Sequence, residues 1–173
     1  VSPCAWVMEA TTGELPSEGK RLAQLSAEVT HNHPEGIKGA MATADAIYMC
    51  RYFFGSDNPA DIKRRVKEHI EKEYGYDLSK TLDEIRPTYR FNETCQDTVP
   101  QAIVAFLEST YFEDAIRNAI SLGGDSDTLA AITGSIAEAA YGIPEWITNK
   151  VYTYLDEPLK DVLRRWEEFV VIK

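Results

Sequence analysis

Residues 121–142 read SLGGDSDTLAAITGSIAEAAYG and join a glycine-rich acidic loop to a helix of small side chains. Gly123 and Gly124 end the helical pattern of the preceding segment. The next helix is predicted to begin at Asp127 or Thr128 and to stop at Gly142. Alanine and glycine along this helix allow neighbouring backbones to approach closely. We therefore expect this helix inside a helical bundle.

Helical periodicity continues along the rest of the chain, and no segment alternates as a strand would. Predicted helices cover residues 17–32, 34–54, 58–74, 79–85 (capped by Ser79), 99–109 and 112–122, followed by a short helix from Pro144 and a last one with Pro158 in its first turn. The expected fold is all-α, with eight or so helices in a single domain over residues 1–173.

Composition limits the possible functions. The 173 residues are 44% apolar and 27% charged, with a formal net charge of -10, so a basic nucleic-acid surface is not expected. No apolar run is long enough to span a membrane. Three separated cysteines without metal-binding spacing are expected to be free thiols, which favours a cytoplasmic location.

The acidic loop carries the most informative chemistry. Asp125 and Asp127 can point to one side of the loop, and Thr128 can add a hydroxyl at the start of the helix. Such oxygen ligands suit Mg²⁺ or Mn²⁺, and the bare backbone of Gly123 and Gly124 could approach a diphosphate. By itself the motif is more often a simple helix N-cap than a metal site.

Histidines give weaker signals. His31 and His33 form an H-x-H pair, for which a hydrogen-bonding role at a helix end is favoured over metal binding, because no third ligand is near in the sequence. His69 falls on a charged helix face and is predicted to be solvated. The charged residues 61–73 are expected to form a surface helix with ion pairs four residues apart.

Several stretches together resemble a known family. The run from Gly123 to Ala137, followed by Tyr141 to Pro144, looks like the C-terminal signature of ADP-ribosylglycohydrolases, including the dinitrogenase-reductase-activating type. Further agreement lies in residues 1–3, 26–40, 98–103 and 105–109.

This resemblance implies a compact multi-helix bundle with a two-magnesium centre, where water cleaves the bond between ribose C1 and an acceptor. By position, Asp125, Asp127 and Thr128 match metal ligands of the family, with Mn²⁺ as a possible substitute for Mg²⁺. Substrate-binding positions match Gly123, Gly124, Ser126 and His31. No catalytic acid or base can be assigned. The implied substrate is an ADP-ribosylated protein or a small ADP-ribose conjugate.

The sequence departs from the family in one respect. The family completes its metal site with a Thr-Asp-Asp run and an upstream acidic residue, and the 173 residues contain no Thr-Asp-Asp. We therefore expect this chain to be the C-terminal portion of the catalytic domain, inactive alone, with the N-terminal part of the same protein as its partner. Two alternatives stay open: a non-catalytic module that binds ADP-ribose or a related nucleotide, and a purely structural helical domain.

Overall fold

The computed structural model describes residues 1–7, 17–53 and 58–171, and in these ranges every regular element is a helix. The prediction of an all-α fold is confirmed. Ten helices lie in the described ranges: α1 (Ser2–Trp6), α2 (Ser17–Glu28), α3 (Pro34–Phe53), α4 (Pro59–Tyr74), α5 (Leu82–Ile85), α6 (Cys95–Leu107), α7 (Phe112–Ser121), α8 (Ser126–Tyr141), α9 (Glu145–Tyr152) and α10 (Glu157–Val171).

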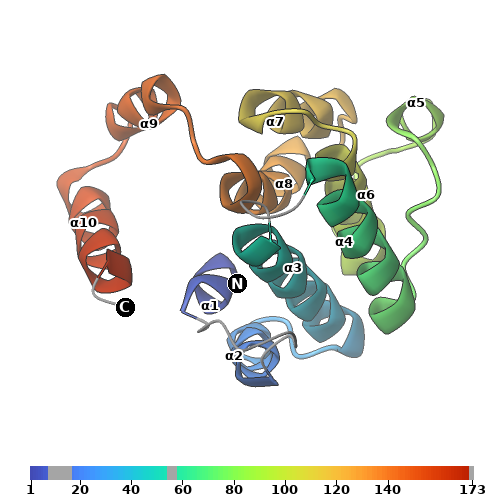
Figure 1. Ribbon diagram of the computed structural model, residues 1–173, viewed down its shortest axis with the longest axis horizontal. Helices are drawn as coiled ribbons and strands as arrows, with labels where there is room; N and C mark the ends of the chain where they lie inside the picture. The colour runs from blue at the N-terminus through green and yellow to red at the C-terminus, as the bar shows by residue number, and fades with distance from the viewer. Residues whose placement is uncertain (8–16, 54–57, 172–173) are drawn as a thin grey trace. The chain divides into compact units, whose positions relative to one another are not determined.

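The chain divides into two compact units. Residues 1–141 form the larger unit with α1 to α8, and residues 142–173 form the smaller unit with α9 and α10. Within the larger unit, α8 packs against α3, α6 and α7, while α1 and α2 pack against α3 (Figure 1). The acidic loop lies in the larger unit, at the start of α8.

Small residues let the central helices approach, as the sequence predicts. A Cβ added to Gly39 of α3 would lie 3.1 Å from Cγ2 of Val99 in α6, and one added to Gly134 of α8 would lie 3.0 Å from Cδ1 of Ile116. The buried Thr133 hydroxyl donates to the carbonyl of Ala102 at 2.8 Å, which fixes α8 on α6.

Helix boundaries differ from the prediction at α5 and α6. The cap of α5 is Thr81 instead of Ser79, because Thr81 and Glu84 form a reciprocal capping box. Helix α6 begins at Cys95, one turn before the predicted Val99. Pro100 is tolerated inside it because the carbonyl it leaves without a donor belongs to an exposed residue, Gln96, which water can reach.

Helix α4 shows both a confirmed and a wrong prediction. Its charged face carries the pair Arg64–Glu68 at 2.9 Å, four residues apart as expected. His69, however, is not simply solvated, because its Nε2 lies 2.9 Å from Oδ2 of the fully buried Asp45 in α3. The same Oδ2 accepts from the Tyr74 hydroxyl at 2.5 Å and pairs with Lys20 at 3.3 Å. We call these four residues the Asp45 cluster.

Candidate functional site

The loop of residues 123–128 connects α7 to α8 through two left-handed glycines. Gly123 has φ of 71° and Gly124 has φ of 64°, a conformation that costs residues with a Cβ about 1–2 kcal/mol. Helix α8 then starts at Ser126, and the carbonyl of Asp125 accepts the first helical hydrogen bond from Leu129 N at 3.1 Å. The glycines thus turn the chain so that Asp125 stands at the N-terminus of α8.

The two aspartates of the loop interact directly. A hydrogen bond from the Asp125 carboxyl group, which can form only while that group carries a proton, is the main cause that lowers the pKa of Asp127, and the backbone N–H groups of Asp127 and Thr128 lower it further. Asp127 and Thr128 are exposed, and Asp125 is half-buried. The helix N-terminus therefore holds a carboxylate pair at the surface, beside a hydroxyl.

These groups are hard oxygen donors of the kind that Mg²⁺ and Mn²⁺ take. In the described part of the chain, no group of three or more His, Cys, Asp or Glu side chains could hold a metal ion. The loop offers two carboxyl groups and the hydroxyl of Thr128, which is about half of an octahedral shell. The donor type fits a divalent cation, and the number of donors requires further ligands.

A neighbouring segment, residues 86–94 between α5 and α6, crosses the loop. A Cβ on Gly124 would lie 2.9 Å from Cε1 of Tyr89 and 3.1 Å from the carbonyl oxygen of Arg90. Arg86 Nε donates to Oγ of Ser121 at 2.9 Å, which ties the beginning of this segment to the end of α7. We call residues 86–94 the strap.

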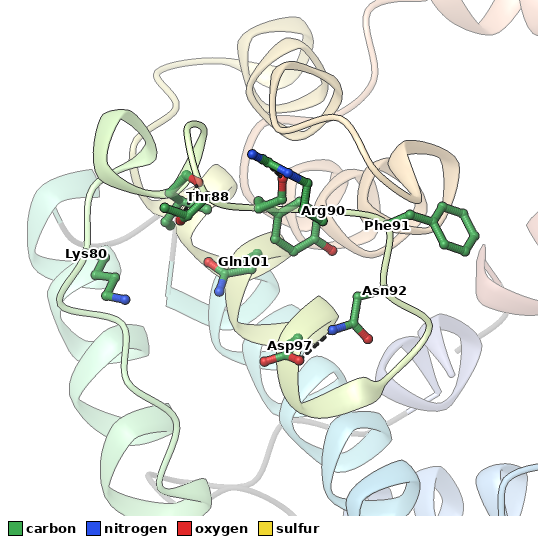
Figure 2. Close-up of a pocket in the computed structure, with 9 residues that line it drawn as sticks. Lys80, Thr88, Arg90, Phe91, Asn92, Asp97 and Gln101 are labelled. Carbon is green, nitrogen blue, oxygen red and sulfur yellow. Dashed lines mark hydrogen bonds between the residues drawn. The ribbon is translucent and has the colours of Figure 1, made fainter.

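The strap and α6, together with Lys80 and Ile85, line a pocket of about 290 Å³. Figure 2 shows Asn92 and Asp97 facing each other, joined by a hydrogen bond of 2.6 Å, while Phe91 points away from the other labelled side chains. Lys80 and Arg90 bring positive charge to the lining. Sequence reasoning missed the strap, because an irregular segment has no periodicity that could reveal what it contacts.

His31 and His33 both make local hydrogen bonds. The ring Nδ1 of His33 accepts from the backbone N–H of Glu35 at 3.2 Å, which confirms the predicted role at a helix end. Nδ1 of His31 lies 2.7 Å from the Thr30 hydroxyl, and the ring is exposed. The substrate-binding role of His31 stays a prediction.

The other predicted substrate-binding residues lie together in the loop. Gly123 and Gly124 are exposed, and Ser126, the first residue of α8, is half-buried. A Cβ on Gly123 would meet nothing within 4 Å. The side of Gly123 on which a Cβ would stand is therefore open, whereas the same side of Gly124 lies against Tyr89 and Arg90 of the strap.

Comparison with known proteins gives a consistent result. The sequence model of the ADP-ribosylglycohydrolase family matches residues 2–170. An uncharacterized protein of Archaeoglobus fulgidus is 34% identical over 149 residues, covering 80% of this chain and 48% of that protein. The ADP-ribosylarginine hydrolase Tri1 of Pseudomonas putida is 27% identical over 129 residues, covering 72% of this chain and 34% of that protein.

Human ADP-ribosylhydrolase ARH3 is 25% identical over 166 residues, which covers 73% of this chain and 45% of that protein. The chain thus spans about half or less of the length of these relatives. No solved structure matches the chain significantly. Among the described residues, no helix is long and apolar enough to cross a membrane.

Proposed function

The chain belongs to the ADP-ribosylglycohydrolase family, and from this premise we propose that it supplies one half of the metal site of a Mg²⁺-dependent hydrolase. The proposed reaction releases ADP-ribose from an acceptor, either a protein side chain or a small conjugate. The single observation that carries this proposal is the position of Asp125 and Asp127, two residues apart at the N-terminus of α8. Mn²⁺ could replace Mg²⁺, since both take oxygen ligands.

Each residue of the loop has a proposed task. Asp125, Asp127 and the Thr128 hydroxyl would hold the cation, which would relieve the repulsion between two neighbouring carboxylates. The loop backbone at Gly123 and Gly124 would lie along the diphosphate, with Gly123 the more accessible of the two, and Ser126 would border it. Bound Mg²⁺ would supply Lewis acidity and orient the ribose hydroxyls and the attacking water.

The remaining ligands would come from outside these residues. The resemblance implies a Thr-Asp-Asp run and an upstream acidic residue, and the sequence contains no Thr-Asp-Asp. We propose that activity belongs to a longer protein that contains both parts, and that the 173 residues alone are inactive. All three cysteines are free, which supports the proposed cytoplasmic location.

The test is hydrolysis by the full-length protein with arginine-, serine- and acetyl-linked ADP-ribose. We expect Mg²⁺-dependent release of ADP-ribose from at least one of these substrates. Asp125→Asn should lower the rate more than about tenfold, because even residues that only support a metal ligand have effects of this size. The matched control is Asp61→Asn on the exposed face of α4. No release from any substrate would refute the proposal.

A second candidate is a binding module that recognises ADP-ribose without turnover. It is favoured by the composition of the loop, in which both acidic side chains are assigned to the cation and no general acid or base is evident among the described residues 123–128. Calorimetry separates the two functions. Mg²⁺-dependent binding of ADP-ribose by a full-length protein that hydrolyses none of the three substrates identifies the binding module.

A further inference from the structure

A groove runs along α6 beside the strap. The pocket that the strap lines continues into a second pocket of about 290 Å³, which α6 lines together with Lys38 and residues 75–77. The two pockets share four lining residues, Lys80, Ile85, Asp97 and Gln101. They therefore form one elongated depression, lined by the strap at one end and by residues 75–77 at the other. We call it the α6 groove.

The side chains of the α6 groove include both donors and acceptors of hydrogen bonds. Lys80 and Arg90 form no ion pair with any residue that the structure describes. The amides of Gln96 and Gln101 make no hydrogen bond within the same part of the chain, so each keeps a free donor and a free acceptor. Figure 2 shows the polar ends of Lys80 and Gln101 pointing toward one another across the pocket. Asp97 adds an exposed carboxylate.

This mixture of groups suits a peptide better than a phosphate. Phosphate oxygens are acceptors, and the carboxylates of Asp77 and Asp97 would repel their charge. A peptide main chain carries one N–H donor and one carbonyl acceptor per residue. It can therefore pair with ammonium, amide and carboxylate groups along the same groove, and its length fits the elongated shape.

The α6 groove borders the acidic loop through Tyr89. This residue lines the groove, and its Cε1 would lie 2.9 Å from a Cβ on Gly124, the residue before Asp125. In the strap, the backbone N–H groups of residues 90–92 have no hydrogen-bond acceptor among the described residues. They remain available to the carbonyl groups of another chain. A segment held in the groove therefore lies beside the proposed metal site.

We propose that the α6 groove binds an extended peptide segment of the acceptor protein through its main chain. The inference rests on the proposed function, and it names ADP-ribosylated proteins, instead of small conjugates, as the substrate class. Lys80 and Gln101 donate to carbonyl groups of the peptide. Asp97 accepts from Asn92 and Thr94 through Oδ2 alone, so its Oδ1 is available to an N–H group of the peptide.

The first test measures peptide binding by the 173-residue chain and needs no catalysis. The probe is an unmodified decapeptide of glycine, alanine and serine, added while the backbone signals are followed by NMR. We expect selective shifts at Lys80, Arg90 and Gln101. Gln101→Ala should raise the dissociation constant about fivefold, the loss that corresponds to one ordinary hydrogen bond. The control is Gln24→Ala on the exposed face of α2, which should leave it unchanged.

Three results of this titration would overturn the proposal. The first is an equal dissociation constant for the wild-type chain and Gln101→Ala. The second is the absence of selective shifts in the groove at the highest soluble concentration of the decapeptide. The third comes from ADP-ribose or inorganic phosphate as the probe: if either shifts the groove signals and displaces the decapeptide, the groove serves a nucleotide or an anion and not a peptide.

A kinetic test separates the groove from the metal site. It gives the full-length protein two substrates with the same linkage, one on the decapeptide and one on the free amino acid. Gln101→Ala should raise KM for the peptide substrate about fivefold and leave kcat/KM for the small substrate unchanged, because only the peptide reaches the groove. Equal effects on both substrates would refute the groove and keep the hydrolase. No hydrolysis of either substrate by the wild type would refute the proposed function, and the titration would still decide whether the groove binds a peptide.

Discussion

The Asp45 cluster and the 123–128 loop both contain aspartate carboxylates, but one is buried and the other is exposed. Asp45 is fully buried in α3, and one of its oxygens meets Lys20, His69 and Tyr74. Asp127 is exposed at the start of α8, and its main side-chain neighbour is another carboxyl group. One carboxylate is thus surrounded by donors that the fold supplies, whereas the other is placed next to a second acceptor.

The difference separates a structural from a functional acid. A buried carboxylate must be compensated inside the protein, and the neighbours of Asp45 on α2 and α4 do this while they join three helices. An exposed carboxylate pair needs no such compensation to fold, and it gains most from a cation. The next four experiments test this distinction, in order of decreasing effect on stability.

The largest effect is expected from Asp45→Asn. The amide keeps one acceptor oxygen, but it removes the negative charge that pairs with Lys20 and faces His69, and it places an NH2 group in the buried cluster. Breaking a buried ion pair in this way costs about 3 kcal/mol of unfolding free energy. Urea unfolding of the 173-residue chain measures it. Asp61→Asn on the exposed face of α4 should change stability by less than about 0.5 kcal/mol, and equal effects of the two variants would contradict the structural role of Asp45.

The second experiment tests whether the strap packs against the loop. It compares substitutions at two glycines that have the same backbone conformation. Gly124 and Gly75 have φ of 64° and 65°, but an added Cβ meets Tyr89 and Arg90 only at Gly124. Gly75→Ala should cost about 1 kcal/mol for the left-handed conformation, and Gly124→Ala about 1–2 kcal/mol more for the overlap. Urea unfolding again measures both. Equal costs would show that the strap does not press on the loop.

How far the sequence predicts each region depends on how local its interactions are. The acidic loop was predictable because Gly123 to Thr128 adjoin in the chain and because glycine, aspartate and threonine have well-defined preferences at a helix start. Helix α8 follows from the same local rules, and its small residues correctly predicted close packing.

The rest depended on contacts between distant residues. Asp45 and His69 are 24 positions apart. The charged face of α4, considered alone, therefore predicts a solvated His69. The strap reaches Ser121 from Arg86, 35 positions away, and its irregular backbone has no period to read. Tertiary packing determines both the Asp45–His69 contact and the position of the strap, and no local sequence pattern encodes it. The capping box at Thr81 is different, because its T-x-x-E pattern is local and identifies the correct cap, Thr81 instead of Ser79, from the sequence alone.

Glu84 is a third carboxylate, and its only role is in a helix capping box. It therefore serves as a control for Asp127. Like Asp127 it is exposed, and hydrogen bonds from the backbone and side chain of Thr81 lower its pKa below the ordinary 4.5. A lowered folded-state pKa means that ionised Glu84 stabilises the fold above pH 4.5, and that this contribution disappears as the pH falls through the lowered pKa. Glu84→Gln should therefore have a slightly lower thermal midpoint than the wild type at neutral pH and an equal one in acid. An equal difference at both pH values would rule out the charge as the source.

The smallest effect on stability, and the most informative for function, is expected from Asp127→Asn without divalent cations. If Asp127 serves a cation, the variant loses little in the metal-free chain, because one of two repelling carboxylates is removed together with its interaction with the helix N-terminus. Added Mg²⁺ should then raise the thermal midpoint of the wild-type chain more than that of Asp127→Asn, since a ligand stabilises the state that binds it. Glu84→Gln should keep the full Mg²⁺ response. If Asp127→Asn also kept it, Asp127 would be a helix cap like Glu84, and the carboxylate pair would have no role in metal binding.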